Sequence, residues 1–214
     1  MDSAVILVFQ LIVLIFSVMI HEISHGYIAE YLGDPTARLA GRLTLNPLKH
    51  LDFFGSFLLP VSLFLLSGGG FVFGWAKPVP YNPAYLKNPK SGAGKIASAG
   101  PLSNLIIAVA FGALLRVLLL SGYPLGQELG LFFSFIIYIN LLLAVFNLVP
   151  VPPLDGSKVL FAILPSSEFS LRMMSFLERY GLVLILLFIF FGFRFITPII
   201  DILYFAVAGH PPGF

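Results

Sequence analysis

Residues Ile12 to Gly33 read IVLIFSVMIHEISHGYIAEYLG, an apolar run that carries the pattern His21-Glu22-x-x-His25. In a helix, residues four apart lie on one face and rise only about 6 Å along the axis, so both imidazoles can reach one cation. Glu22 is not needed as a ligand and can take a proton from a water held by the metal. The stretch therefore predicts a helix that carries a metal site and a base together.

The alternative is that these polar side chains occur by accident or belong to a buried structural network. The preceding run from Ala4 to Ile20 has only Gln10 and Ser17 as polar residues, and the helix is long enough to cross a bilayer. Ionisable side chains at membrane depth are costly unless they are satisfied, so they mark functional sites. The membrane setting therefore favours a metal site over an accident.

The composition predicts an integral membrane protein of the all-α polytopic class. The 214 residues are 58% hydrophobic and only 10% charged, and we expect them to form one domain over 1–214, in contact with membrane lipid. Lys and Arg form no run, which excludes a nucleic-acid partner. Cysteine is absent, so His and carboxylate groups are the expected metal donors. His50 lies outside the apolar runs and is expected at the surface.

Four apolar helices are expected from the hydropathy and the chain breakers. The first ends at the helix terminator Gly33-Asp34-Pro35, and the third ends in the proline-rich run 150–153. Gly100 and Asn104, four residues apart on one face of the second, suit close helix packing with a hydrogen bond across the contact. The core spans are expected at about 3–32, 95–120 and 128–148, followed by a C-terminal apolar helix at about 180–208.

Residues 36–45 alternate between apolar or small residues and residues such as Arg38 and Arg42, which predicts a small membrane-associated β element. An unpaired strand edge there could hold an extended substrate by β-addition. A plain amphipathic connector fits the same periodicity equally well.

The apolar segment 53–75 has two possible topologies. It is long enough to cross the bilayer, but it contains Pro60 and three consecutive glycines at 68–70, which suit a re-entrant segment. The choice sets the direction of every later span. We expect the re-entrant form, because only that form returns the later helices to the side on which the first helix ends.

Asp155 is the best candidate for a third metal ligand. A catalytic zinc usually takes three protein donors, and Asp155 follows a proline-stiffened turn at the end of a span. Its alternative role is an N-cap for the next short helix. Glu30, Asp34 and Asp52 are rivals by residue type, but they lie at or beyond the end of the first helix.

The loop charges predict the orientation of the protein in the membrane. Segments 33–52, 76–95 and 150–179 hold 3, 4 and 3 Lys or Arg residues, while the loop 121–127 holds none. By the positive-inside rule the three basic segments face the cytoplasm. With a re-entrant 53–75, the active site opens towards the cytoplasm, and the cell membrane is the expected location.

These motifs resemble the site-2 protease family, the zinc metalloproteases that cut proteins within membranes. The resemblance covers most of the chain and rests on three blocks: His21-Glu-Ile-Ser-His25, Gly100-Pro-Leu-Ser-Asn104, and the run from Asn147 to Gly156 with its prolines and Leu-Asp-Gly. The chain is similar to the compact branch of the family, which lacks a PDZ domain and has the segment 74–80, Gly-Trp-Ala-Lys-Pro-Val-Pro.

The resemblance implies a function and a role for each matching residue. His21, His25 and Asp155 would bind one zinc ion, and Glu22 would be the general base. Asn147 would position the substrate or stabilise the oxyanion, and the β element would bind the substrate. Gly100 and Asn104 would mark the packing face near the cleft.

The implied reaction is hydrolysis of peptide bonds in or near transmembrane segments of a protein or peptide substrate. The alternatives are a membrane metal-ion transporter, since intramembrane His and carboxylate groups also line cation paths, and a catalytically silent scaffold. The sequence does not determine the oligomeric state.

Overall fold

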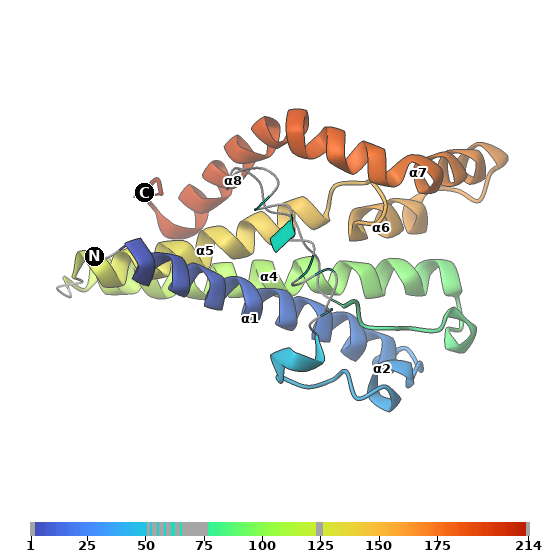
Figure 1. Cartoon of the computed structure of the whole chain (residues 1–214), viewed down its shortest axis with the longest axis horizontal. Coiled ribbons are helices and arrows are strands. Elements are labelled where there is room, and N and C mark those ends of the chain that lie inside the picture. The colour runs from blue at the N-terminus through green and yellow to red at the C-terminus, as the bar shows by residue number, and fades with distance from the viewer. Residues whose placement is uncertain are drawn as a thin grey trace.

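The structure, a computed structural model, describes residues 3–50, 52, 55, 58, 61, 62, 65, 77–122 and 126–212. This part of the chain is helical and contains no strand (Figure 1). Its α-helices are α1 (Ser3–Tyr31), α2 (Thr36–Leu39), α4 (Pro89–Leu120), α5 (Gln127–Asn147), α6 (Asp155–Ile163), α7 (Glu168–Leu187) and α8 (Phe193–Ala208). Two 3-10 turns, η1 (Pro47–Lys49) and η3 (Pro83–Tyr85), precede α4, and the π-helical turn η4 (Phe188–Gly192) joins α7 to α8.

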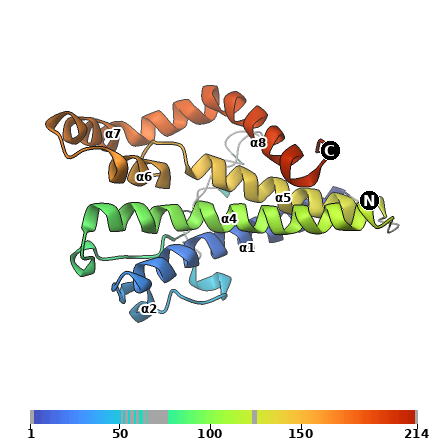
Figure 2. The same cartoon turned by 180° about the vertical axis from the view of Figure 1, so that it is seen from behind.

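Helix α4 lies at the centre of the bundle and contacts α1, α5, α6 and α8 (Figures 1 and 2). The long helices alternate in direction: α1 and α5 run one way, and α4 and the α7–α8 rod run the other way (Figure 1). As a result, the end of α1, the start of α4 and the helix α6 all lie at the same end of the bundle. This end holds the candidate site.

Four helical segments of the described chain are long and apolar enough to cross a membrane: Ala4–Tyr31, Pro89–Leu120, Glu128–Asn147 and Glu168–Ala208. Their apolar side chains face outward in large numbers, as expected for helices surrounded by lipid tails. The protein is therefore an integral membrane protein. The fold class that the composition predicts, all-α and polytopic, is confirmed.

The helix ends follow from local signals in the sequence. The side chain of Asn88 accepts a hydrogen bond from the Ser91 N–H, and Pro89 takes the first helical position, so α4 begins at 89. The expected start near 95 is therefore wrong by about two turns. At its C-terminus α1 ends at Tyr31, and Gly33 follows two residues later with a φ of 103° that lets the chain turn away from the helix axis.

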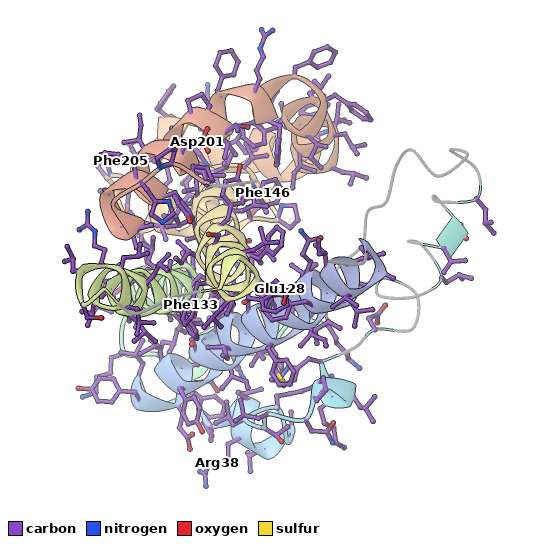
Figure 3. All side chains as sticks on the ribbon, turned by 90° about the vertical axis from the view of Figure 1, so that its left-hand side faces the viewer. Arg38, Glu128, Phe133, Phe146, Asp201 and Phe205 are labelled. Carbon is purple, nitrogen blue, oxygen red and sulfur yellow. The ribbon has the colours of Figure 1, made fainter. Side chains whose placement is uncertain are left out.

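The hydrophobic core fills the space between α4, α5 and α8. Its fully buried members are Ala108, Leu115, Ile137, Leu141, Ile196, Ile200, Tyr204 and Ala208. Phe133 and Phe146 of α5 pack against this cluster, and Figure 3 labels both in a view along the bundle. The Tyr204 hydroxyl donates a hydrogen bond of 2.7 Å to Ser134 Oγ, which satisfies a polar group inside the core.

The predicted β element over 36–45 is wrong. Residues 36–39 form the helical turn α2, and Gly41 adopts a φ of 65° that breaks an extended backbone. The N–H groups of Leu39, Ala40 and Arg42 donate to carbonyls four or five residues earlier in the chain, so they are not available to a partner strand. The alternation in sequence reflects an amphipathic connector, which is the alternative that the periodicity left open.

The predicted re-entrant segment at 53–75 lies almost entirely outside the described residues. The described residues on either side of it are joined, because the Lys77 N–H donates a backbone hydrogen bond of 2.8 Å to the His50 carbonyl. His50 itself is only 3% exposed, so its expected surface position is wrong. Its imidazole Nε2 lies 2.9 Å from the Thr44 carbonyl and holds the connector together.

The C-terminal helix is longer than expected. The polar segment before 180 is already helical from Glu168, where the Ser167 side chain accepts a hydrogen bond from the Ser170 N–H and caps α7. The rod then continues through η4 into α8, which ends at Gly209 with a φ of 87°. The expected apolar helix at about 180–208 is thus the second part of one helical rod.

Candidate metal centre and catalytic site

His21 and His25 lie on one face of α1, one helical turn apart. Their ring centroids are 4.7 Å apart, and the ring planes meet at 89°. Both residues are buried, with 5% and 9% of their surface exposed. The two imidazoles therefore converge on one small volume inside the protein.

Asp155, the first residue of α6, completes this volume. Its Oδ2 atom lies 3.0 Å from His21 Nε2 and 3.1 Å from His25 Nε2. Leu154 is the N-cap residue of α6, and no side chain caps this helix, so the alternative role of Asp155 as a cap does not apply.

Close contacts with α4 and with the end of α5 hold α6, the helix that begins with Asp155. A Cβ atom on Gly94 of α4 would lie 2.2 Å from the Cβ of Ala162, so α6 approaches α4 closely. A Cβ atom on Gly156 would lie 2.2 Å from the Leu148 carbonyl oxygen, so only glycine fits after Asp155. The glycine in the Leu-Asp-Gly run thus lets the first turn of α6 pack against the end of α5.

The donor set of this site calls for a cation. The Nδ1 atom of His25 lies 2.7 Å from the Ile96 carbonyl, which can only accept, so Nδ1 carries the proton and Nε2 of a neutral ring offers a lone pair. The Nδ1 atom of His21 lies 2.6 Å from Asn104 Oδ1, an arrangement of the same kind. Two imidazole lone pairs and a carboxylate oxygen therefore converge, and they repel one another unless a positive ion is shared among them.

The geometry fits zinc. Zinc binds His nitrogen and carboxylate oxygen at about 2.0–2.2 Å in a tetrahedral arrangement, which separates ligand atoms by about 3.4 Å. The distances of 3.0 and 3.1 Å from Asp155 Oδ2 to the two Nε2 atoms are close to this value. Three protein donors also leave a fourth tetrahedral position for water or substrate.

Glu22 lies beside the two histidines, and one ligand atom of each of these three residues falls within 4.8 Å of the others. Its Oε2 atom accepts a hydrogen bond of 2.9 Å from the backbone N–H of Val79. Val79 belongs to residues 77–82, an extended stretch that we call the cover segment. The Glu22 carboxylate is thus oriented beside the two imidazoles by a backbone group.

The cover segment is fixed at three points. The N–H groups of Lys77, Val79 and Asn82 donate to the His50 carbonyl, to Glu22 and to Asp34 Oδ2, the last at 2.5 Å. Between these residues stand prolines, which have no N–H to satisfy. The segment is therefore held against α1 and forms one wall of the site.

A cavity of about 140 Å³ lies at this site. Its polar lining comes from His21, Glu22, His25, Asn147, Asp155 and Lys158, and the cover segment contributes Pro78, Val79 and Tyr81. The Lys158 ammonium lies 5.6 Å from the centre of the Tyr81 ring. The cavity is large enough for several water molecules and brings both proposed catalytic residues to the same space as the metal donors.

Asn147 and Gly100 also lie at this site. Asn147 lines the cavity, and its Nδ2 donates one hydrogen bond of 2.9 Å to the Leu143 carbonyl, which leaves its second N–H available. A Cβ atom on Gly100 would lie 2.4 Å from His21 Nε2, so α4 can pass the metal donors only because residue 100 has no side chain.

Several residues that support the site were not predicted from the sequence. The Val79 contact uses a backbone N–H, for which side-chain patterns give no signal. Asn140, by contrast, is a buried amide in an apolar span, and a polar side chain at membrane depth is itself a signal. Asp34, considered only as a rival ligand, instead holds the cover segment.

The comparison with known families agrees with this geometry. The chain matches the sequence profile described as peptidase family M50 over residues 9–131 and 125–188, which together include every residue of the candidate site. This chain belongs to peptidase family M50. The site-2 proteases that the motifs resemble are this family, so the resemblance is confirmed.

The chain is also similar to several curated proteins. The chain is 40% identical to "Putative zinc metalloprotease YwhC" of Bacillus subtilis (strain 168), over 89% of this chain and 81% of that protein. It is 32% identical to "Putative zinc metalloprotease Rip2" of Mycolicibacterium smegmatis, over 66% of this chain and 52% of the relative. It is 27% identical to "Zinc metalloprotease MJ0392" of Methanocaldococcus jannaschii, over 90% of this chain and 45% of the relative.

The chain thus spans most of the length of YwhC, but only about half of the other two relatives. No solved structure matches it at a significant level.

Proposed function

We propose that this M50 peptidase is an intramembrane zinc metalloprotease that hydrolyses peptide bonds in or near transmembrane segments of membrane proteins. His21, His25 and Asp155 hold one zinc ion, and Glu22 is the general base. The relatives' names support the metal and the reaction class. The observation that carries the assignment is the convergence of Asp155 Oδ2 on both Nε2 atoms, at 3.0 and 3.1 Å.

The chemistry follows from the placement of these groups. Bound zinc lowers the pKa of a water ligand and polarises a carbonyl group. Glu22 takes the proton from the attacking water and passes it to the leaving amine. The Val79 N–H holds Oε2 of Glu22, so the free oxygen of the carboxylate performs the proton transfer.

Asn147 is the residue proposed to stabilise the oxyanion or to position the substrate. Its amide reaches the cavity from the last turn of α5, and one of its N–H bonds is directed to the Leu143 carbonyl. The other can donate to the oxygen that becomes negative during attack, which stabilises the transition state. Because this helix end is anchored to α6 through Gly156, the amide is held on a rigid element.

We also propose that the chain over 1–214 is one catalytic domain in the cell membrane, with its active site open to the cytoplasm. The basic segments 33–52, 76–95 and 150–179 adjoin the end of α1, the start of α4 and helix α6, and these lie at one end of the bundle (Figure 1). Such a bias is typical of the cytoplasmic side. The expected partners are a transmembrane substrate and membrane lipid.

The re-entrant form of 53–75 remains a prediction. Two observations support it: α1 and α4 run in opposite directions (Figure 1), and the Lys77 N–H donates a backbone hydrogen bond to the His50 carbonyl, so the described residues before and after the segment are in contact. Flanking residues that contact each other are what a re-entrant segment requires.

The two alternatives from the sequence are not favoured. A transporter and a silent scaffold both lack support in the relatives, which are named as proteases. A scaffold also gives no reason for Glu22 to be held at the metal donors by a backbone N–H.

The direct test is Glu22→Gln, assayed in proteoliposomes with a panel of single-span substrates. We expect zinc to be retained and cleavage to fall by about 100-fold or more, because glutamine cannot act as a base. The matched control is Glu30→Gln on the same helix. The Glu30 carboxylate forms an ion pair of 2.6 Å with Arg38 and is not one of the metal donors, so this variant should cleave substrate at the wild-type rate. Cleavage by Glu22→Gln at the wild-type rate would reject the assigned base.

A further inference from the structure

A chain of buried polar side chains runs from the metal donors into the membrane part of the bundle. It contains His21 and Ser17 of α1, Asn104 of α4 and Asn140 of α5. Ser17 is 4% exposed, and the two asparagines are fully buried. Buried amides in apolar helices are costly unless every group is satisfied, so this chain calls for a role.

The orientation of each amide in this series of hydrogen bonds is set by a neighbouring carbonyl group, which can only accept a hydrogen bond. Asn140 Nδ2 lies 2.8 Å from the Ile136 carbonyl and 3.0 Å from Ser17 Oγ. A carbonyl accepts only, so the Asn140 amide must turn its NH2 group to these partners. Its Oδ1 therefore faces Asn104.

The same reasoning orients Asn104. Asn104 Nδ2 lies 2.9 Å from Asn140 Oδ1 and 3.3 Å from the Ser17 carbonyl, and both are acceptors. The NH2 group of Asn104 is therefore used on this side, and its Oδ1 faces His21 Nδ1 at 2.6 Å. That oxygen requires an N–H on Nδ1, which leaves the lone pair on Nε2, the atom that faces Asp155.

We propose that Asn140, together with Ser17, is a positioning residue that fixes the Asn104 amide and thereby sets His21 in the tautomer that binds metal. The inference rests on the proposed function, since it takes His21 as a zinc ligand. An Asn104 amide turned by 180° would present its NH2 group to His21 Nδ1 and favour the tautomer with the proton on Nε2. Asn140 acts two residues away from the metal and prevents this turn.

The first test is the zinc affinity of the purified full-length protein and its Asn140→Leu variant, measured by competition with a chelator. Leucine has a similar volume and no hydrogen-bonding groups. Loss of a group that orients a ligand typically costs 10–100-fold in metal affinity, so we expect about a tenfold loss for this more distant residue. An unchanged affinity would overturn the proposal.

The second test separates orientation from packing. In an Asn104→Asp background both carboxylate oxygens accept, so His21 Nδ1–H keeps its partner whichever way the group is turned. Adding Asn140→Leu to this background should then change zinc affinity by only about twofold or less, the scale expected of uncoupled sites. An equal loss in both backgrounds would show a packing role and overturn the proposal.

A matched control lies on the same helix. Ser134 of α5 is 4% exposed and bonds to Tyr204, away from the metal donors, so Ser134→Ala should lower thermal stability without changing zinc affinity. If Asn140→Leu does not fold, Ser17→Ala takes its place. This variant removes the Ser17 Oγ atom that accepts a hydrogen bond from the Asn140 amide, and it should also weaken zinc binding. Wild-type zinc affinity in Ser17→Ala would then count against the proposal.

The inference and the proposed function fail in different ways. If the wild-type protein binds no zinc, the proposed function is wrong and the inference fails with it. If the wild type binds zinc through Asp155 but Asn140→Leu binds it equally well, only the inference is wrong.

Discussion

The backbone N–H of Val79 donates a hydrogen bond of 2.9 Å to Oε2 of Glu22, across 57 residues of sequence. This contact joins the proposed general base on α1 to the cover segment, residues 77–82. The cover segment is itself anchored by Asp34, so the end of α1 holds the wall of the site in place. The orientation of the base therefore depends on a connector and not only on the helix that carries the metal motif.

Val79→Pro tests this contact because it removes the N–H and leaves an extended backbone between two existing prolines. A hydrogen bond to a charged group contributes about 1.5–3 kcal/mol, so we expect cleavage to fall by about tenfold or more while zinc content stays unchanged. The control Val79→Ala keeps the N–H and should retain most activity. Equal rates for Val79→Pro and Val79→Ala would show that the amide does not orient Glu22.

Gly100→Ala should displace the His21 imidazole, since the new Cβ atom would lie 2.4 Å from Nε2. We expect zinc affinity to fall by about tenfold or more, because a ligand must stay close to its ideal geometry to bind zinc. The control is Gly130→Ala in α5, where a Cβ atom meets no neighbour within 4 Å, and its zinc affinity should match wild type. The measurement is chelator competition on both variants, and a wild-type value for Gly100→Ala would contradict the close approach.

Asp34 makes the stability of the cover segment depend on pH. Burial tends to raise the pKa of its carboxyl, but hydrogen bonds from Thr36 and from the Asn82 N–H outweigh burial and lower that pKa. A carboxyl whose pKa is lower in the folded state stabilises the fold above its unfolded pKa of about 3.9 and loses this contribution as the pH falls through the folded value.

Asp34→Asn should therefore lower the thermal unfolding temperature at pH 6 and above, and the difference from wild type should narrow below about pH 4. Unfolding curves in detergent between pH 3 and pH 7 measure both quantities. A difference that stays constant over this range would show that the Asp34 charge does not contribute.

The parts of the fold that could be predicted are those with strong local signals. The apolar run around His21 predicts a spanning helix, and prolines after Asn147 predict the end of another. The start of α4 could have been found too, because Asn88-Pro89 is a helix-start signal. The alternation at 36–45 led to a wrong prediction of a strand. Over so few residues, a short amphipathic helix and a strand can show the same spacing of polar and apolar residues.

The residues that converge at the site could be predicted from the sequence, but the contacts that orient them could not. His21 and His25 follow from helical spacing, and Asp155 follows from the chemistry of a third donor. Their roles as zinc ligands remain predictions. The Val79 contact depends on a backbone N–H that no residue type encodes, and the burial of His50 depends on how a connector folds over itself.

The central claim is that Asp155 shares one metal ion with His21 and His25, and its most direct test is the zinc content of purified wild-type protein and Asp155→Ala. We expect about one zinc per chain in the wild type and a loss of most of it in the variant, because two imidazoles alone do not complete a catalytic zinc site. A folded Asp155→Ala variant that still holds one zinc per chain at wild-type affinity would contradict the account.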